Sequence, residues 1–548
     1  MFGNFKANTL MPYQHSDVQK GRDVTIPALP NRQPFLSRRM HWMNMLDLHA
    51  TDRPDDIIIT TESDSISWGR LQREVQAMAA DLQHRGVEAG DRVLILSLNR
   101  ADYIAAMLAI NTLGAITVPL NIRSVPRELD YFITDSGAKA IYVDAMGAKT
   151  LAAAEGRHGL EVISFDEDLP GVIEAGGAVE HLDIDENSIA MIMYTSGTTS
   201  APKGVMLSYL NLLSQTIPIF RSAPAPGDLP DVNLVVVPLF HIAGVGFLTP
   251  AFFAGTRLVI APPQVLTNIP ALADMIEKER VTSMFLVPTI WQALCSLPGI
   301  KERDLPLRSI SWGASPASRQ TLELMAETFP NAAISAAFGQ TEMSPVTAQL
   351  QGPDSVRKMG SIGKAIGPVA VRVVDADGNE VSDGEMGEVV YRGPGFMAGY
   401  WNSPEATEAA THDGWFHSGD LVRRDEEGFM YVVDRAKDLI ISGGENISSI
   451  EVEHAVAGHP KVADASVVGV PDEKWVETPV AIVVPADPQD PPTLEELHDF
   501  LSNKLASFKK PTRLEIVDEL PRNASGKLLK HKLRAEYGKE PEQVGEAK

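Results

Sequence analysis

The stretch Ile189-Ala-Met-Ile-Met-Tyr-Thr-Ser-Gly-Thr-Thr-Ser-Ala-Pro-Lys-Gly-Val205 joins an apolar run to a loop rich in glycine and hydroxyl groups. The run Ile189–Tyr194 has the length and composition of a buried strand. A loop that holds a polyphosphate needs close backbone approach, N–H and O–H donors, and a positive charge. The loop supplies all three from Gly197, Gly204, Lys203 and five hydroxyl residues, Thr195, Ser196, Thr198, Thr199 and Ser200. We predict a phosphate-binding loop, and a polar surface loop is the alternative for the stretch taken alone.

The regions around this loop alternate between helix and strand patterns. Trp68–Arg85 has the periodicity of an amphipathic helix, and Tyr103–Leu113 reads as a second helix. Strand patterns that are apolar on both faces occupy Asp91–Ser97, Ala115–Pro119 and Ala138–Asp144. Such strands, alternating with helices, indicate parallel sheets covered by helices. The predicted fold class is therefore α/β, with a large N-terminal domain of layered βαβ sheets.

The pattern changes after Pro368. Val369–Val374 and Gly387–Tyr391 are short β-rich runs, and the first ends in the turn Asp375-Ala-Asp-Gly378. This spacing predicts a small antiparallel or barrel-like subdomain.

A separate unit begins beyond Asp434. Its predicted elements are helix Ser449–Ala457, strands Val462–Val470 and Pro479–Val484, helix Thr493–Lys504 and strand Leu514–Ile516. A mixed α+β unit of about 110 residues is long enough to fold alone. We therefore divide the chain into an N-terminal extension (residues 1–40), a large domain (41–435) and a small C-terminal domain (436–548).

Composition excludes several classes of function. The net charge is −24, from 48 basic and 72 acidic residues. Binding to nucleic acid or to an anionic membrane surface requires clustered Lys and Arg, so neither is expected. Leu234–Gly255 has no charged residue, but its prolines and glycines favour a strand, a turn and a buried helix over a transmembrane span. The N-terminus lacks the apolar run of a secretory signal.

Cys295 is the one cysteine of the chain. It excludes internal disulfides, and its apolar neighbours predict a buried thiol rather than a nucleophile. A reducing cytoplasm fits this cysteine usage. The sequence does not determine the oligomeric state, and a homodimer remains open.

Further motifs follow the loop in a fixed order across Trp42–Tyr537. They read Pro238-Leu-Phe-His-Ile-Ala-Gly244, Ser311-Trp-Gly-Ala-Ser315, Phe338-Gly-Gln-Thr-Glu342, Trp415-Phe-His-Ser-Gly-Asp420, Val433-Asp-Arg435, Ser442-Gly-Gly-Glu-Asn446 and Pro521-Arg-Asn-Ala-Ser-Gly-Lys527. With the loop, these motifs resemble those of the adenylate-forming superfamily in its acyl-CoA synthetase branch. The chain is most similar to bacterial, particularly actinobacterial, fatty-acyl-CoA synthetases. At Ser200 the superfamily usually has glycine, and a serine with positive φ there would cost about 1 kcal/mol.

The resemblance implies ATP, Mg²⁺ and coenzyme A as cofactors or cosubstrates. It assigns nucleotide and cofactor binding to Thr195, Ser196, Gly197, Thr198, Thr199, Lys203, Gly313, Ala314, Ser315, Phe338, Gly339, Gln340, Asp420, Arg435, Gly443 and Gly444. Phe338 offers a face for adenine, and Asp420 and Arg435 would contact the ribose. Lys527, Thr341 and Glu342 are the implied catalytic residues, and Glu342 is also the implied ligand of Mg²⁺. Lys527 would offset charge as the carboxylate and the phosphate meet.

The acyl site is assigned to His241, Gly244, Val245, Gly339 and Met343, and its candidate lining also includes Phe240, Ile242, Ala314 and Val346. For His241 a pocket gate and a structural role are equally favoured. Acetyl-specific relatives have Trp where this chain has Gly339, so a longer acid is expected to enter. The apolar lining favours a medium- or long-chain fatty acid, and aromatic or sterol side-chain acids remain alternatives.

The implied reaction forms acyl-AMP and pyrophosphate, and a thiol then displaces AMP. The small domain is expected to rotate about Ala436–Lys437 between the steps, exchanging Lys527 for Gly443–Gly444. Because 21 residues (548 − 527) follow Lys527, free CoA is expected rather than an attached carrier domain. An acyl-AMP ligase that loads a separate carrier protein is one alternative. A non-catalytic nucleotide-binding protein is another, disfavoured because Lys203, Glu342 and Lys527 are all present.

Overall fold

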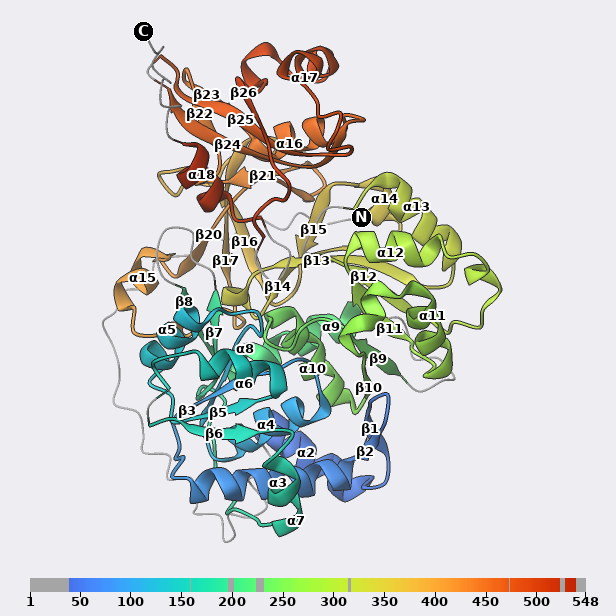
Figure 1. Ribbon diagram of the computed structural model, residues 1–548, viewed down its shortest axis with the longest axis vertical. Helices are drawn as coiled ribbons and strands as arrows, with labels where there is room; N and C mark the ends of the chain where they lie inside the picture. Colours follow the sequence, from blue (N-terminus) through green and yellow to red (C-terminus); the bar gives the residue numbers. More distant parts are fainter. Residues whose placement is uncertain are drawn as a thin grey trace, which may run out of the picture.

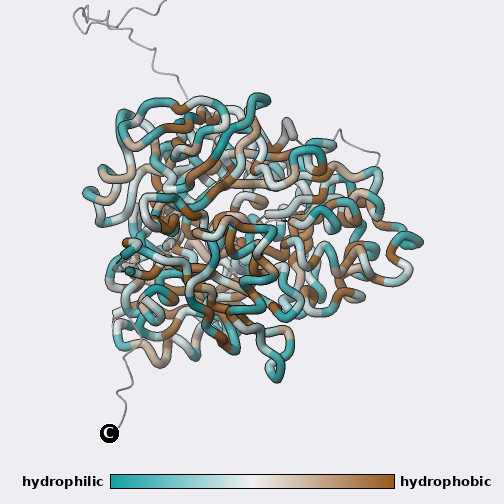
Figure 2. The backbone as a smooth tube through the Cα atoms, turned by 90° about the horizontal axis from the view of Figure 1, so that it is seen from above, coloured by the Kyte–Doolittle hydropathy of each residue, from teal (hydrophilic) through white to brown (hydrophobic). Residues whose placement is uncertain are grey.

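The computed structural model describes residues 39–157, 159–195, 202–222, 231–313, 317–472, 474–522 and 528–538. A large α/β unit carries a smaller unit at one end, shown in orange to red in Figure 1. Hydrophobic segments run through the interior, and hydrophilic segments are more frequent at the periphery (Figure 2). The prediction of a large N-terminal and a small C-terminal part is confirmed.

A seven-stranded sheet contains the strand that precedes the predicted phosphate loop. Its order is β18-β8-β7-β4-β3-β5-β6. The strands are β3 (Arg92–Leu96), β4 (Ile116–Pro119), β5 (Ala140–Val143), β6 (Glu161–Ser164), β7 (Ile189–Thr195), β8 (Lys203–Ser208) and β18 (Gly399–Tyr400). The five neighbouring strands β6, β5, β3, β4 and β7 are parallel, whereas β8 pairs antiparallel with both β7 and β18. The predicted loop therefore lies at the tip of the β7–β8 hairpin.

A second path of 14 strands runs β16-β17-β20-β21-β15-β14-β13-β12-β11-β9-β10-β1-β2, with β19 (Thr411–His412) paired to β20. The half from β1 to β13 consists of β1 (Ile57–Thr60), β2 (Ser65–Ser67), β9 (Val232–Val235), β10 (Arg257–Ile260), β11 (Ser283–Leu286), β12 (Ser309–Trp312) and β13 (Ala333–Gly339). All neighbours in this half are parallel except β1 and β2.

The other half of this path is antiparallel. It contains β14 (Val346–Gln351), β15 (Ser361–Ala365), β16 (Ala370–Val374), β17 (Met386–Arg392), β20 (Trp415–Arg424) and β21 (Met430–Arg435). The antiparallel part of the prediction after Pro368 is confirmed. The strands continue the large sheet in an open order, so over the described residues they do not close into a barrel.

Helices cover both sheets. They are α2 (Trp42–Asp52), α3 (Trp68–His84), α4 (Ala101–Thr112), α5 (Pro126–Ser136), α6 (Ala145–Ala152), α7 (Leu169–Ala175), α8 (Tyr209–Ser214), α9 (Thr216–Ser222), α10 (Ile242–Ala254), α11 (Ile269–Lys278), α12 (Pro288–Cys295), α13 (Arg319–Thr328), α14 (Asp354–Arg357) and α15 (Pro404–Ala409), with 3₁₀ turns η1 (Pro263–Thr267), η2 (Ile300–Glu302) and η3 (Thr341–Met343). Helix α3 begins where the Ser67 side chain accepts a hydrogen bond from the Arg70 N–H, and its apolar face is buried.

The small unit has strands β22 (Ile440–Ser442), β23 (Glu445–Ile447), β24 (Val462–Asp472), β25 (Val476–Pro485) and β26 (Arg513–Ile516). Helices α16 (Ser449–Ala457), α17 (Leu494–Leu501) and α18 (Lys530–Tyr537) and the 3₁₀ turn η4 (Ser507–Lys509) complete it. Its core is separate from those of the large unit. The helices and strands predicted for this region are all present.

Two predictions made from composition are also confirmed. Leu234–Gly255 forms the end of β9, a turn and the buried helix α10, and none of the helices described is long and apolar enough to cross a membrane. Cys295 is buried at the end of α12, and burial raises the pKa of its thiol to about 11. A thiol held protonated in this way is a poor nucleophile.

Candidate functional site

One cavity of about 2630 Å³ is lined by most of the predicted site residues that fall within the described ranges. Its walls come from both sheets of the large unit and from the facing side of the small unit. The predicted residues that line it are Thr195, Lys203, His241, Gly313, Phe338, Gly339, Gln340, Thr341, Glu342, Asp420 and Arg435. This volume exceeds that of a pocket for one drug-sized ligand, roughly 300–1,000 Å³. The cavity can therefore hold a nucleotide and a second substrate together.

Tyrosines anchor the two ends of the predicted phosphate loop. The hydroxyl of Tyr194 donates to Asp135 at 2.6 Å, and that of Tyr131 donates to the Pro202 carbonyl at 2.8 Å. Thr195 and Lys203 pair across the β7–β8 hairpin. Both ends are thus fixed at the cavity wall. Ser196, Gly197, Thr198, Thr199 and Ser200 lie outside the described residues.

Tyr400 connects the lysine of this hairpin to Glu342. The Tyr400 hydroxyl donates to Oε1 of Glu342 at 3.0 Å, and Nζ of Lys203 lies 5.0 Å from the centre of the Tyr400 ring. Burial and the neighbouring carboxylate raise the pKa of Tyr400, which keeps its hydroxyl a donor. The Tyr400 side chain therefore contacts Glu342 through its hydroxyl and Lys203 through its ring face. Tyr400 was not among the predicted residues, because nothing in the sequence links β18 to Glu342.

Glu342 has the chemistry of a Mg²⁺ ligand. Its Oε2 atom accepts no hydrogen bond from the described residues, and the side chain lines the cavity. Over the described ranges, no group of three His, Cys, Asp or Glu side chains forms an all-protein metal site. Mg²⁺ usually binds one or two carboxylates together with substrate phosphates, so a single carboxylate beside the predicted phosphate loop fits this ion.

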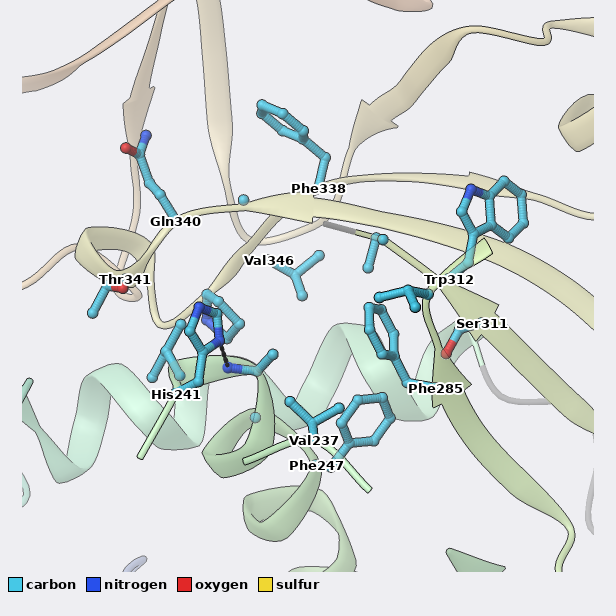
Figure 3. A pocket seen from close by; sticks show the side chains of 18 of the residues that line it. Val237, His241, Phe247, Phe285, Ser311, Trp312, Phe338, Gln340, Thr341 and Val346 are labelled. Carbon is cyan, nitrogen blue, oxygen red and sulfur yellow. Dashed lines mark hydrogen bonds between the residues drawn. The ribbon is translucent and has the colours of Figure 1, made fainter. Parts of the chain in front are cut away.

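The strand β13 and the turn η3 form the next part of the wall. Phe338 lies on the opposite side of β13 from Val346 in Figure 3, so the strand separates two regions of the cavity. A Cβ atom on Gly339 would overlap the carbonyl oxygen of Pro345. Glycine is thus required here by a close backbone approach, in addition to leaving space in the cavity. Gly313 lines the same wall, and Ala314 and Ser315 lie outside the described residues.

Asp420 and Arg435 face each other across β20 and β21. Nε of Arg435 is 2.9 Å from Oδ1 of Asp420, whose side chain is only 6% exposed. The preceding segment is held by Glu388, which accepts from the Gly419 N–H at 2.8 Å and contacts Nδ1 of His417 at 2.7 Å. Glu388 thus fixes the backbone that presents Asp420. Glu388 lies on the neighbouring strand β17 and was not among the predicted residues.

An apolar recess extends the cavity between α10 and the sheet. Phe247, Phe285 and Val346 project into it, whereas Trp312 points to the opposite face of the sheet (Figure 3). On α10 the lining residues include Ala243, Gly246, Phe247 and Pro250, at helical spacing on one face. His241 lines the other end and caps α10, with its Nδ1 accepting from the Ala243 N–H at 3.2 Å.

Three predicted acyl-site residues do not line the recess. Val245 and Met343 are buried in the core, with exposures of 1% and 0%. Gly244 lies where α10 approaches the Pro238 carbonyl closely, at 2.5 Å from an added Cβ. Gly244 and Val245 on α10, and Met343 on η3, are absent from the cavity lining, although other residues of both elements contribute to it. Their burial assigns them to packing.

In the small unit, residues on both sides of 523–527 line the cavity. Arg522 and Leu529 both line it. Gly443 and Gly444 form the exposed turn between β22 and β23 and do not line it. Lys527 itself lies outside the described residues. Arg522 and Leu529 are therefore turned toward the same cavity as the residues predicted to bind the nucleotide.

Two family models match this chain. The model described as AMP-binding enzyme matches residues 46–401, and the model described as AMP-binding enzyme C-terminal domain matches residues 451–527. A feruloyl-CoA synthase from Amycolatopsis is 36% identical over 86% of this chain and 94% of its own length. A 2-succinylbenzoate–CoA ligase from Bacillus cereus is 33% identical over 90% and 98%. A fatty acid–[acyl-carrier-protein] ligase from Streptomyces coeruleorubidus is 32% identical over 89% and 95%.

Solved structures show the same similarity. The o-succinylbenzoate CoA synthetase of Bacillus subtilis in complex with its acyl-adenylate superposes with a TM-score of 0.80 at 31% identity, covering 89% of this chain and 97% of the other. The same enzyme with ATP and magnesium ion gives a TM-score of 0.80 and covers 89% and 99%. The similarity spans both units of the chain.

Proposed function

This chain belongs to the AMP-binding enzyme family, and from that premise we propose that it joins a hydrophobic, ring-containing carboxylic acid to CoA. The enzyme is an AMP-forming acid–thiol ligase that uses ATP, Mg²⁺ and CoA. The observation that carries the proposal is one cavity in which Lys203, Glu342 and the Asp420–Arg435 pair meet an aromatic-lined recess. A nucleotide and an apolar acid would thus lie side by side.

In the proposed first step, the carboxylate oxygen of the acid attacks the α-phosphorus of ATP. The bond to the β-phosphate oxygen breaks, pyrophosphate leaves with the electron pair, and acyl-AMP remains. Asp420 and Arg435 hold the ribose, and Phe338 stacks on adenine. Lys203, with the hydroxyls of its loop, binds the outer phosphates, and Thr341 donates to the α-phosphate. Lys527 would bridge the two anionic reactants, which lowers their mutual repulsion as they approach.

Glu342 would hold Mg²⁺ through its free carboxylate oxygen. When bound, the ion supplies charge neutralisation on the phosphate oxygens. The Tyr400 hydroxyl orients this carboxylate. Tyr400 therefore acts on the ion through Glu342.

In the proposed second step, the thiol of CoA attacks the acyl carbonyl. The thioester forms, the thiol proton passes to solvent, and AMP leaves. We assign Ala436–Lys437 as the pivot about which the small unit, residues 436–548, turns between the steps. That turn would bring the exposed Gly443–Gly444 segment toward the cavity in place of Lys527.

The shape and chemistry of the recess support an acid that contains a ring. Phe247 and Phe285 pack with ring centres 5.8 Å apart and give the recess two aromatic walls. Aromatic walls favour planar groups through offset or edge contacts. The relatives named for feruloyl-CoA and 2-succinylbenzoate–CoA formation support the same class. A fatty acid is the second candidate, supported by the apolar lining and by the relative named for fatty acids.

A ligation assay over a panel of acids tests the proposal. Hydroxycinnamic, arylacetic and benzoic acids, fatty acids of increasing length and a sterol side-chain acid are incubated with ATP, Mg²⁺ and CoA, and AMP and thioester are measured together. We expect equal amounts of AMP and aryl-CoA, with the highest kcat/KM for an aryl acid. A preference for long fatty acids would support the second candidate. Thioester formation only on an acyl carrier protein would replace CoA as the acceptor.

A further inference from the structure

Two hydrogen bonds from one serine join the large sheet to the small unit. Asp434, on β21, accepts at Oδ2 from the Ser449 N–H at 2.6 Å and from the Ser449 hydroxyl at 2.7 Å. Asp434 is 1% exposed and Ser449 is fully buried. A buried carboxylate is stable only when its oxygens are bonded, and the N-terminus of helix α16 favours a negative charge. We call this contact the Asp434–Ser449 latch.

The latch lies across the proposed pivot. Asp434 precedes Ala436–Lys437, and β21 belongs to the large sheet. Ser449 follows the pivot, and α16 packs on the small sheet through Val452 and Val456. A rotation of the small unit would carry Ser449 away from Asp434. Both hydrogen bonds would then break.

The latch is also connected to the lysine motif. Nζ of Lys530 donates to the Ser449 hydroxyl at 2.7 Å and pairs with Glu453 at 2.8 Å. Lys530 begins α18, three positions after Lys527 (530 − 527). Its side chain is only 12% exposed. The positive end of Lys530 thus reaches the buried carboxylate of Asp434 through one hydroxyl group.

We infer that Asp434 and Ser449 are positioning residues that stabilise the arrangement used for the adenylation step. The inference rests on the proposed two-step function. With the latch closed, the flanks of the lysine motif line the cavity and Gly443–Gly444 are turned away. Opening the latch releases the small unit for the thioester step. Its strength therefore sets the balance between the two arrangements.

The two half-reactions measured separately test this inference. Ser449→Ala removes the hydroxyl and keeps the N–H donor. We expect acid-dependent ATP–pyrophosphate exchange to fall about tenfold, as for the loss of one hydrogen bond to a charged group. Conversion of supplied acyl-AMP and CoA to thioester should stay within about twofold or become faster. Asp434→Asn should shift the ratio of the two rates in the same direction.

Ser136→Ala is the matched control. Ser136 is a fully buried serine at the end of α5, and its hydroxyl donates to the Phe132 carbonyl. Both half-reactions should be unchanged in this variant. An equal fall of both rates in Ser449→Ala, or no change in either, would overturn the inference. Absence of exchange in the unmodified enzyme with every acid would instead reject the proposed function.

A distance measurement gives a second readout that does not depend on activity. Spin labels at Val162→Cys and Ile516→Cys, in a Cys295→Ala background, report the separation of the two units. Val162 and Ile516 are 42% and 43% exposed. Ser449→Ala should broaden or shift the distance distribution of the unliganded enzyme. Identical distributions with and without the serine hydroxyl would contradict the inference.

Discussion

Nε of Arg435 lies 2.9 Å from Oδ1 of Asp420 across the paired strands β20 and β21. Arg435 is the last residue of β21, one residue before the proposed pivot, and both side chains line the cavity. The carbonyl of Gly419 accepts from the N–H of Ala436 at 2.9 Å. The proposed ribose contacts and the pivot therefore share one backbone segment.

Replacing Asp420 should weaken ATP binding selectively. Asp420→Ala removes the carboxylate proposed to accept from the ribose hydroxyls. Hydrogen bonds to a charged group contribute about 1.5–3 kcal/mol, so KM for ATP should rise at least about tenfold, with KM for the acid nearly unchanged. Glu427→Gln is the control, because Glu427 pairs with Arg357 and Lys358 away from the cavity. An unchanged KM for ATP in Asp420→Ala would remove this assignment.

Replacing Lys527 should separate the two steps. Lys527→Ala removes the cation proposed to bridge the acid and the α-phosphate. We expect acid-dependent ATP–pyrophosphate exchange to fall by a factor of about 100 or more, within the range for one lost transition-state donor. Supplied acyl-AMP should still be converted to thioester. Exchange at the unmodified rate would show that another residue performs this role.

A larger side chain at Val346 should shorten the accepted acid. Val346 projects into the recess beside Phe285 (Figure 3). In Val346→Phe, kcat/KM for bulky acids should fall about tenfold or more, and short acids should change much less. Val162→Phe, on the exposed strand β6, is the size-matched control. If every acid is affected equally, the recess is not the acyl site.

The stability of the large unit should fall in acid because of His41. Burial lowers the pKa of His41 from 6.5 to about 4, since the imidazolium form is poorly solvated. The neutral ring is therefore the stable form in the fold. Its contribution is complete above pH 6.5 and is lost as the pH falls from 6.5 toward 4. The loss is at most about 3 kcal/mol.

His41→Asn tests this pH dependence. Nδ1 of His41 accepts from the Asn44 N–H and caps α2, and an asparagine oxygen can accept the same bond. Urea unfolding between pH 7 and 4 should show a smaller decrease in the free energy of unfolding for the variant. Exchange of the exposed His84 for Asn should leave the pH dependence unchanged. Parallel curves for the enzyme and His41→Asn would contradict the prediction.

Much of the fold could be predicted because its helices and strands have strong local periodicity. Helix α16 begins and ends at the predicted residues, and β3 to β5 lie within one or two residues of the predicted strands. The open form of the antiparallel part could not be predicted. Whether strands close or continue a sheet depends on long-range pairing, here of β15 with β14 and β21.

Site residues that belong to a sequence motif could be predicted. Residues that reach the site through contacts between distant parts of the chain could not. Tyr400 reaches Glu342 from 58 positions away, and no local pattern indicates that contact. The motif also did not indicate which face of helix α10 is turned toward the cavity. Gly244 and Val245 are buried in the protein core, whereas Ala243, Gly246 and Phe247 line the cavity. A motif thus located the wall, and packing decided which side chains line it.

The most direct test of the account follows one oxygen atom. The enzyme is incubated with ATP, Mg²⁺, CoA and an acid labelled with ¹⁸O in its carboxylate, and the products are examined by mass spectrometry. If the carboxylate attacks the α-phosphorus, AMP gains one ¹⁸O atom, and the thioester keeps the other. Label in inorganic phosphate together with ADP, or unlabelled AMP beside a labelled acid and thioester, would contradict the acyl-adenylate route.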